Sequence, residues 1–314
     1  MSSIPTHATI REVGLRDGLQ SIQTILPTDA KCEWIRRAHA AGLTEIEVGS
    51  FVPPKLLPQM ADTAEVVAFA KTLPGLSVTA LVPNLIGAQR AMDTGVDHIV
   101  LPISASAAHS QANVRRSPAE MIDVLRTIVS ERDTRQSPVR IEAGIGTAFG
   151  CGLQGYVEPA DVIALMRSAL DAGADCTSLA DTIGYADPAS VRRLFTEARN
   201  IAGERLWSGH FHDTRGLALA NVFAALECGV TRFDASLAGI GGCPFAPGAS
   251  GNVATEDLAY MLTSMGVDTG VDVPALFQLR AFVEDHLSGE TLHGTIYRAG
   301  LPLTFPDTTH AIAQ

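Results

Sequence analysis

The sequence predicts an α/β protein that folds as a (β/α)8 TIM barrel with additional C-terminal helices. Eight short β-rich runs alternate with helical segments, a glycine ends four of the helices, and polar residues gather where the strands end. Eight such units in 314 residues match the count and size of this barrel. An open, doubly wound sheet is the alternative that the pattern alone leaves.

Four of the predicted strands stand as separate apolar runs, and four close a repeated segment of helix end, glycine and strand. The separate runs are 9–13, 77–82, 139–145 and 206–212, and the repeated segments are 40–48, 93–101, 171–179 and 227–235. The glycines of these segments are Gly42, Gly95, Gly173 and Gly229. Each fits a left-handed helix stop, because a residue without Cβ has no steric penalty there.

The predicted helices carry one apolar stripe each, as helices that cover a sheet do. Apolar residues recur at i, i+3, i+4 and i+7 from Val162 to Ala169 and from Leu219 to Leu226. No linker divides the chain, so we expect a single domain over residues 1–314. Helices are also predicted at 256–265 and 273–287, in an extension over roughly 256–314 that packs around one barrel mouth or forms a partner surface.

The composition argues against several classes of function. With 23 Lys+Arg against 34 Asp+Glu the formal charge is −11, which disfavours a nucleic-acid partner. No apolar run is long enough to span a bilayer, and the N-terminus lacks the features of a secretory signal. Five cysteines without a CxxC pair fit reduced thiols, so we expect a cytoplasmic protein without a membrane partner.

Residues capable of catalysis fall at the ends of the predicted strands. They are Arg16 and Asp17 after the first strand, Glu47 in the second, Asp181 after the sixth, His210 and His212 at the end of the seventh, and Cys243 after the eighth. In a barrel these positions share one face, which is the face that carries active sites.

His210 and His212 form an HxH pair in a predicted strand. Residues i and i+2 of a strand point to the same side, so both imidazoles would project into the barrel mouth, although such a pair can be incidental. Asp17 on a nearby strand and the adjacent Asp213 favour a shared metal ion. Imidazole, carboxylate and amide donors without a thiolate pair favour Mg²⁺ or Mn²⁺ over structural zinc.

Arg16 and Asp17 directly follow an apolar strand, and a salt bridge at the barrel rim is one interpretation of the pair. Gly14 and Gly18 on either side favour a sharp turn and close backbone approach, which a solvated rim does not need. Asp181 also has two interpretations. It can belong to a supporting acidic shell, or it can be the N-cap of the following helix.

The stretch 239–252 holds five glycines in fourteen residues, and we expect a mobile loop at the catalytic face. It lacks the Gly-Lys-Ser/Thr end of a phosphate-binding P-loop. Cys243 on such a loop is better suited to act as a proton donor, proton acceptor or nucleophile. Of the other cysteines, Cys32, Cys176 and Cys228 lie on helical or strand patterns and are expected to be packing residues, and Cys151 is open to either role.

Eight short motifs stand out along the chain. They are 13–20 (VGLRDGLQ), 46–47 (IE), 50–52 (SFV), 58–60 (PQM), 83–84 (PN), 181–184 (DTIG), 210–214 (HFHDT) and the stretch from 241–244 (GGCP) through 251–252 (GN). Together they closely resemble the 3-hydroxy-3-methylglutaryl-CoA lyases, which belong to the DRE-TIM metallolyases, a (β/α)8 superfamily. The likeness runs from about residue 8 to about residue 272.

This resemblance implies a role for each of several groups of residues. A divalent cation would be held by Asp17, His210, His212 and Asn252, with Glu12, Asp181 and Glu256 in a supporting shell. Arg16, Asp17, Glu47 and Cys243 would be catalytic, Arg16 by stabilising an enolate and Cys243 as a mobile acid or base. Gln20, Lys55 and Asn84 would bind the CoA thioester. A homodimer or larger homo-oligomer is expected.

The implied reaction is the retro-Claisen cleavage of 3-hydroxy-3-methylglutaryl-CoA (HMG-CoA) to acetyl-CoA and acetoacetate, a step of leucine degradation. The chain departs from the usual family pattern at Leu15, Ser21-Ile22, Val48-Gly49, 105–109 and 150–152, around the acyl pocket and the CoA approach. The alternative is therefore a lyase or Claisen-type synthase for another carboxylated 3-hydroxyacyl-CoA. A catalytically silent metal- or CoA-binding scaffold is the third option. The roles of His109 and Cys151 stay open.

Overall fold

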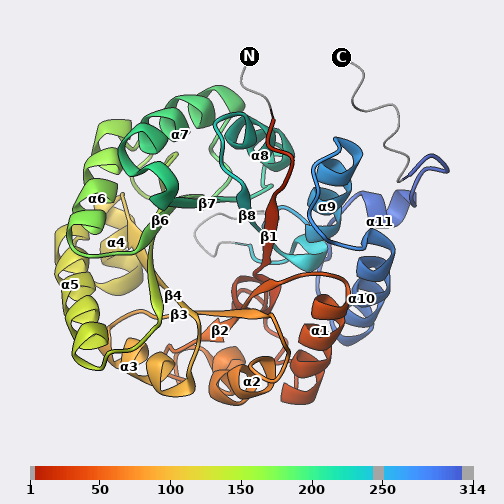
Figure 1. Ribbon diagram of the computed structural model, residues 1–314, viewed down its shortest axis with the longest axis horizontal. Helices are drawn as coiled ribbons and strands as arrows, with labels where there is room; N and C mark the ends of the chain where they lie inside the picture. The colour runs from red at the N-terminus through yellow and green to blue at the C-terminus, as the bar shows by residue number, and fades with distance from the viewer. Residues whose placement is uncertain (1–3, 243–250, 306–314) are drawn as a thin grey trace.

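The computed structural model describes residues 4–242 and 251–305. Eight parallel strands form a closed barrel in chain order, and helices surround it (Figure 1). The strands are β1 Thr9–Glu12, β2 Glu45–Ser50, β3 Ser77–Leu81, β4 His98–Ser104, β5 Arg140–Gly146, β6 Cys176–Asp181, β7 Leu206–Phe211 and β8 Arg232–Ala235. The predicted (β/α)8 barrel is confirmed, and the doubly wound alternative is wrong.

Helices follow the strands around the outside of the barrel. The α-helices of the described residues are α1 Thr28–Ala40, α2 Thr63–Ala70, α3 Leu85–Thr94, α4 Ala107–Val114, α5 Pro118–Thr134, α6 Pro159–Asp171, α7 Pro188–Ala202, α8 Ala218–Glu227, α9 Thr255–Ser264, α10 Val273–His286 and α11 Ile296–Ala299. Four short turns of other helix types are η1 Gly14–Gly18, η2 Pro58–Met60, η3 Gly203–Arg205 and η4 Leu237–Gly239. Two of these, η1 and η4, lead from strands into the candidate site.

The strands are largely buried on both faces, as parallel strands enclosed by helices must be. Every residue of β2 after Glu45 is buried, for example. Parallel pairing closes the barrel between β1 and β8, where Thr9 pairs with Arg232 and Glu12 with Ala235. The interior is therefore a packed core whose polar side chains need partners within it.

The four glycines predicted to stop helices all have positive φ, at 92°, 74°, 98° and 81° for Gly42, Gly95, Gly173 and Gly229. Crowding adds to this requirement at Gly42, where a Cβ would lie 2.0 Å from the carbonyl oxygen of Gly270. Glycine at this position therefore ends α1 and lets the segment before α10 pack closely against it.

The predicted apolar stripes face the barrel. Val162, Met166 and Ala169 of α6 are fully buried, and so are Val222 and Leu226 of α8. Burial of a Val, Leu or Met side chain contributes roughly 1.5–3 kcal/mol. Each helix is therefore held on the sheet by its stripe, and the sheet ends are left free to carry loops.

The C-terminal helices complete the outer layer between α8 and α1. Helix α9 packs against α8 and β1, α10 packs against α1 and α9, and α11 packs on α9. Figure 1 shows the three together at one side of the barrel. Arg280 of α10 is buried, forms an ion pair with Glu256 of α9 and donates a 2.6 Å hydrogen bond to the carbonyl of His293. The helices expected after residue 255 are present and lie along the outside of the barrel.

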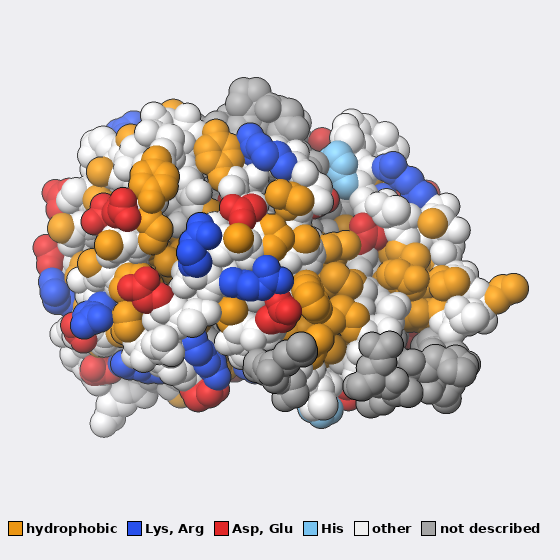
Figure 2. All heavy atoms as spheres, turned by 90° about the horizontal axis from the view of Figure 1, so that it is seen from above, with side chains coloured by type: hydrophobic (Ala, Val, Ile, Leu, Met, Phe, Trp, Pro, Cys, Tyr) orange, Lys and Arg blue, Asp and Glu red, His pale blue; other side chains and the backbone are white. Residues whose placement is uncertain are grey.

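Charged side chains of both signs intermingle on the face drawn in Figure 2. Several surface charges form pairs, such as Lys71 with Asp97 at 2.6 Å and Arg132 with Asp175 at 2.6 Å. In the part of the chain that the structure describes, no helix combines the length and the apolar character needed to cross a bilayer.

Candidate active site and metal centre

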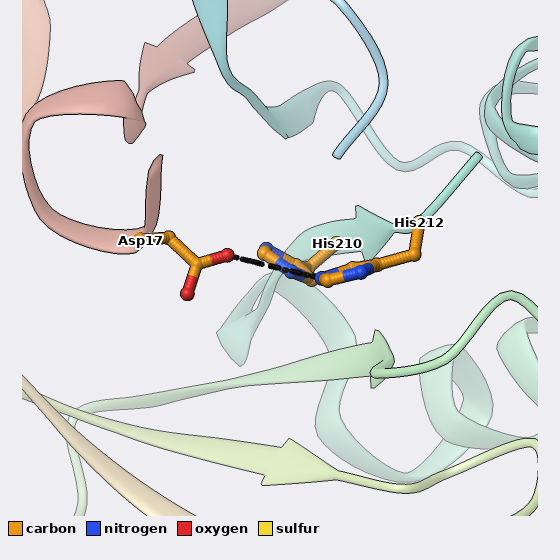
Figure 3. A group of neighbouring side chains, drawn as sticks. All are labelled: Asp17, His210 and His212. Carbon is orange, nitrogen blue, oxygen red and sulfur yellow. Dashed lines mark hydrogen bonds and ion pairs between the residues drawn. The ribbon is translucent and has the colours of Figure 1, made fainter. Parts of the chain in front are cut away.

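The candidate site lies at the carboxyl ends of the strands, where the chain leaves β1 and β7. Asp17 lies in the short turn η1 directly after β1. His210 lies in β7, and His212 follows the strand and bridges to Asn252. Figure 3 shows the Asp17 carboxylate and the two imidazoles directed toward one another. Closure of the barrel thus brings together three distant parts of the sequence.

The side chains of Asp17, His210 and His212 surround one position. The Nε2 atoms of the two histidines lie 3.1 Å apart, and each lies 3.8 Å from Asp17 Oδ2. His210 Nδ1 donates to Asp234 Oδ2 at 3.1 Å, which leaves Nε2 as the ring nitrogen that faces Asp17 and His212. Two ring nitrogens and a carboxylate oxygen that converge in this way fit a divalent cation.

Asn252 completes the group. Its Nδ2 donates to Asp17 Oδ2 at 2.8 Å and to the carbonyl of Ile240 at 3.2 Å. Its Oδ1 is buried and has no hydrogen-bond partner within the described residues. An amide oxygen without a partner beside a carboxylate and two imidazoles is the donor that a hard cation would use. The four residues therefore fit the metal that the sequence predicts.

The electrostatics of Asp17 and His212 suit cation binding. Burial disfavours the ionised form of Asp17, but Arg16 and the two histidines more than offset it and lower the pKa of that carboxyl. Burial, reinforced by His210, lowers the pKa of His212 to about 3, so this imidazole is neutral at neutral pH. A carboxylate and a neutral imidazole are the protonation states that metal ligation requires.

Arg16 lies beside the candidate metal ligands and is held by two carboxylates. Its Nε donates to Glu47 Oε2 at 2.7 Å, and its Nη1 donates to Asp17 Oδ1 at 2.6 Å. The residue is only 9% exposed. Burial alone would lower its pKa, but Asp17 and Glu47 raise it above the ordinary value, so the group stays a cation. The rim salt bridge is thus a buried one, directed into the site.

Glu12 links the loop after β1 to the loop after β8 through hydrogen bonds. Its Oε1 accepts hydrogen bonds from the amides of Gly14 at 2.8 Å and Leu237 at 3.0 Å, and its Oε2 accepts one from Thr255 Oγ1 at 2.6 Å. Burial raises the pKa of Glu12 to about 7. A Cβ on Gly14 would lie 2.5 Å from Glu12 Oε1, so glycine is needed for this close approach.

Glu256 and Asp181 hold two further loops of the site. Glu256 accepts from the amide of Ala238 in η4 at 3.1 Å. Asp181, at the end of β6, accepts from the amides of Tyr185 at 2.7 Å and Ala186 at 3.0 Å. Burial raises the pKa of Asp181 to about 6.

The interpretation of Asp181 as the N-cap of the next helix is wrong. Asp187 caps α7, and its side chain accepts from Ala189 and Ser190. Asp187, six positions after Asp181, takes the capping role, and Asp181 instead supports the loop between strand and helix.

The predicted CoA-binding residues lie in different settings. Gln20 Nε2 donates to Asp17 Oδ1 at 3.2 Å, which places it beside the candidate metal ligands. Asn84 is the N-cap of α3 and accepts from the amide of Gly87 at 3.0 Å. Lys55 is exposed in the turn after β2. Cys243 lies outside the described residues. The roles assigned to these four residues stay predictions.

Gly49, one of the departures from the family pattern, is a packing position. A Cβ there would lie 2.5 Å from Thr63 Oγ1 of α2, and a register shift separates Gly49 from Glu47 in the β2–β3 pairing. The Gly49 position therefore faces a helix. His109, at the start of α4, lies with Nδ1 2.6 Å from Ser104 Oγ.

The cysteines of the described residues are all free thiols. Cys151 is buried, and its sulfur accepts from the amides of Leu153 at 3.3 Å and Gln154 at 3.4 Å, so it stabilises a tight turn. Cys176 is buried 3.7 Å from His98, and burial raises the pKa of its thiol. Cys32 and Cys228 are half-buried on α1 and just after α8.

Sequence reasoning missed a group of charged residues inside the barrel, below the site. Arg11 of β1, Glu142 of β5 and Asp234 of β8 are all buried, and Asp234 contacts His210 of the candidate metal site. The sequence does mark these residues, because each is a charge inside an otherwise apolar strand, and a charge is costly to bury without a partner. The sequence does not indicate which of these charged side chains form ion pairs with one another.

In this closed (β/α)8 barrel, Asp17, His210, His212 and Asn252 lie at the carboxyl ends of the strands. Barrel enzymes carry their active sites at that face, and the protein belongs to this class. The HMGL-like family model matches residues 7–283, and the chain belongs to the HMGL-like family.

Known proteins are similar over most of the chain. A 3-hydroxy-3-isohexenylglutaryl-CoA/hydroxy-methylglutaryl-CoA lyase of Pseudomonas aeruginosa is 42% identical over 275 residues, 87% of this chain and 91% of the relative. The mitochondrial hydroxymethylglutaryl-CoA lyase of Arabidopsis thaliana is 39% identical over 90% of this chain, which spans 60% of that protein. An HMG-CoA lyase of Acinetobacter baumannii, solved with coenzyme A and 3-methylmalate, has a TM-score of 0.90 at 38% identity and covers 96% of this chain and 98% of its own.

Proposed function

We propose that this protein is a divalent-metal-dependent lyase that cleaves HMG-CoA to acetyl-CoA and acetoacetate. The observation that carries the proposal is the convergence of Asp17, His210, His212 and Asn252 beside the buried guanidinium of Arg16. The names of the similar lyases support the substrate.

Asp17, His210, His212 and Asn252 would hold Mg²⁺ or Mn²⁺, since oxygen and imidazole donors suit both ions. When bound, the cation would polarise the tertiary hydroxyl and the carboxylate of the substrate as a Lewis acid. Asp17 contributes a charged oxygen, and the pKa shifts of Asp17 and His212 keep both residues in the form that binds a metal.

Arg16 provides the positive charge that the departing enolate needs. In the cleavage a base takes the hydroxyl proton, the C–C bond breaks, and its electron pair moves onto the thioester fragment. The Nη2 of Arg16 makes no hydrogen bond within the described residues, so it is the donor left for this fragment. Because Glu47 and Asp17 already hold the guanidinium, little reorganisation accompanies charge development. The enolate carbon then takes a proton to give acetyl-CoA, and acetoacetate leaves.

Cys243 is proposed as the mobile acid or base that handles these protons. It lies outside the described residues, but the chain leading to it supports the assignment. A Cβ on Gly241 would lie 2.3 Å from Asn252 Nδ2 and 3.4 Å from the carbonyl oxygen of Asp17. The backbone two residues before Cys243 is therefore packed against two of the proposed metal ligands.

The proposal extends to the surroundings of the reaction. Gln20, Lys55 and Asn84 would contact the CoA thioester, and Glu12, Asp181 and Glu256 would hold the loops of the site. The protein would act as a homodimer or larger homo-oligomer in the cytoplasm, in leucine degradation. The exposed Lys55 suits a contact with CoA phosphates.

A product assay tests the proposal. The purified protein is stripped of metal with a chelator, dialysed, and incubated with HMG-CoA and either Mg²⁺ or Mn²⁺. We expect acetyl-CoA and acetoacetate in equal amounts with either ion and neither product in the stripped sample. An absence of both products with both ions would refute the proposed reaction. A matched assay with a longer-branched 3-hydroxyacyl-CoA measures selectivity for the acyl group.

A further inference from the structure

We propose that Arg11 is a positioning residue for the metal centre: through Asp234 it holds the imidazole of His210 in the orientation that presents Nε2 to the cation. This inference rests on the metal centre of the proposed function. Arg11 lies in β1, one strand away from Asp234 in β8, and His210 lies in β7 on the other side of Asp234.

The register of the barrel places the three residues in one row. Arg11 is the pairing partner of Asp234 between β1 and β8, and His210 is the pairing partner of Asp234 between β7 and β8. Residues paired across parallel strands point to the same face of the sheet. All three side chains therefore project into the barrel interior at the same level.

Arg11 donates two parallel hydrogen bonds to the carboxylate of Asp234. Nε donates to Oδ1 at 2.7 Å, and Nη2 donates to Oδ2 at 3.0 Å. This fork geometry fixes the plane of the carboxylate, which a single hydrogen bond cannot do. His210 is the other residue that hydrogen bonds Asp234 within the described chain, through Nδ1 at 3.1 Å. The Asp234 rotamer, and with it the ring plane of His210, therefore depends on Arg11.

Glu142 anchors Arg11 from the opposite side. Nη1 and Nη2 of Arg11 donate to its two carboxylate oxygens at 2.8 and 3.2 Å, and Ser178 Oγ donates to the same carboxylate. Arg11 and Glu142 are 3% and 0% exposed, so solvent does not screen the pair. A guanidinium held by two forks has no freedom to rotate, which makes it a rigid support.

The hydrogen bond from His210 to Asp234 determines which ring nitrogen of His210 faces the site, which is more than packing of the core would require. A neutral imidazole offers a lone pair at one nitrogen only, and the hydrogen bond of the other nitrogen decides which. Asp234 accepts from Nδ1, so Nε2 is the nitrogen that faces the site, 3.8 Å from Asp17 Oδ2 and 3.1 Å from His212 Nε2. Partners of this kind behind a ligating histidine typically change metal affinity by 10–100-fold when they are removed.

Arg11→Lys is the variant that tests the proposal, since lysine keeps the charge but cannot form two forks. Mn²⁺ binding to the metal-stripped protein is measured by calorimetry and by electron paramagnetic resonance, without substrate. Arg232→Lys is the matched control, because Arg232 lies in the same strand as Asp234 but pairs with Glu45. We expect Arg11→Lys to raise the Kd for Mn²⁺ at least tenfold and Arg232→Lys to leave it unchanged.

A second measurement separates positioning from simple stability. The ¹H–¹⁵N spectrum of the histidine side chains reports whether Nδ1 of His210 is protonated, and we expect Nδ1 to be fully protonated in the parent protein and only partly protonated in Arg11→Lys. If Arg11→Lys does not fold, the double variant Arg11→Met/Glu142→Gln, which removes both charges, is tested in the same way. A folded variant with unchanged Kd and unchanged tautomer would overturn the inference. A parent protein that does not bind Mn²⁺ would overturn the metal centre as well.

Discussion

Asn252 and Asp17 are 235 positions apart in the sequence, yet the amide of Asn252 donates a 2.8 Å hydrogen bond to the Asp17 carboxylate. The contact joins the segment that follows β8 to the turn that follows β1. Because the two residues lie on neighbouring loops only when the barrel closes, the proposed metal centre exists only in the complete fold.

Asn252→Ala should weaken Mn²⁺ binding. The substitution removes the buried amide oxygen that has no partner within the described residues, and with it one of four proposed ligands. We expect the Kd for Mn²⁺ to rise at least tenfold by calorimetry. Asn113→Ala, on the exposed side of α4, is the control and should bind as the parent does. An unchanged Kd in Asn252→Ala would remove this residue from the ligand set.

Arg16→Gln should reduce turnover while metal binding persists. The guanidinium is proposed to offset the charge of the enolate, and removing such a group costs about 3 kcal/mol of barrier, which is about 10²-fold in kcat. Steady-state kinetics with HMG-CoA give kcat, and calorimetry with Mn²⁺ gives the metal affinity. A kcat within threefold of the parent value would contradict the role of Arg16.

Cys243→Ala should likewise lower turnover with metal binding preserved. The thiol is proposed to handle protons and is not a ligand, so kcat should fall by roughly 10²–10⁴-fold while the Kd for Mn²⁺ stays constant. Cys228→Ser, a half-buried thiol after α8, should keep the parent kcat. Equal activity of the Cys243 and Cys228 variants would exclude Cys243 from the chemistry.

Gly14→Ala should impair both stability and activity. The added Cβ would meet Glu12 Oε1 at 2.5 Å and Trp34 Cζ2 at 2.9 Å, so the turn that carries Arg16 and Asp17 must shift. Overpacking of this kind costs about 1–3 kcal/mol of unfolding free energy. Chemical denaturation and kcat measure the two effects. Gly289→Ala, where nothing lies within 4 Å of the new atom, should change neither.

His98 should make the protein less stable in acid. Burial, aided by Arg11 and Arg140 and opposed by Glu142, lowers the pKa of His98 to about 4 from an ordinary value of 6.5. The unfolded chain therefore binds more protons between these values, and stability falls as the pH drops from 6.5 to 4. Over that interval the loss is roughly 3 kcal/mol.

The effect is measured as a difference, because Glu12 acts in the opposite direction. The raised pKa of Glu12, about 7, adds stability as the pH falls from 7 toward 4.5 and partly hides the loss. Unfolding free energies at pH 7.5 and pH 4.5 are compared for the parent and for His98→Gln. The parent should lose roughly 3 kcal/mol more than the variant. Equal losses would show that His98 is not neutral in the folded protein.

Much of the fold and part of the site followed from local patterns. Strand and helix alternation, the glycine stops such as Gly173 and the HxH pair His210–His212 were all predictable, because each depends on the geometry of a short segment. Asp181 was harder, since Asp187 competes for the cap of the same helix. Gly49 was ambiguous because a register shift in β2 changes the surroundings of that position.

The sequence by itself determined the barrel, the face that carries the site and the types of donor present there. Only the tertiary structure decided that Arg11 meets Asp234 and that Asp234 meets His210. The physical reason is register: which side chains face one another across neighbouring strands depends on how β7, β8 and β1 align when the barrel closes. No pattern within a single strand contains that information.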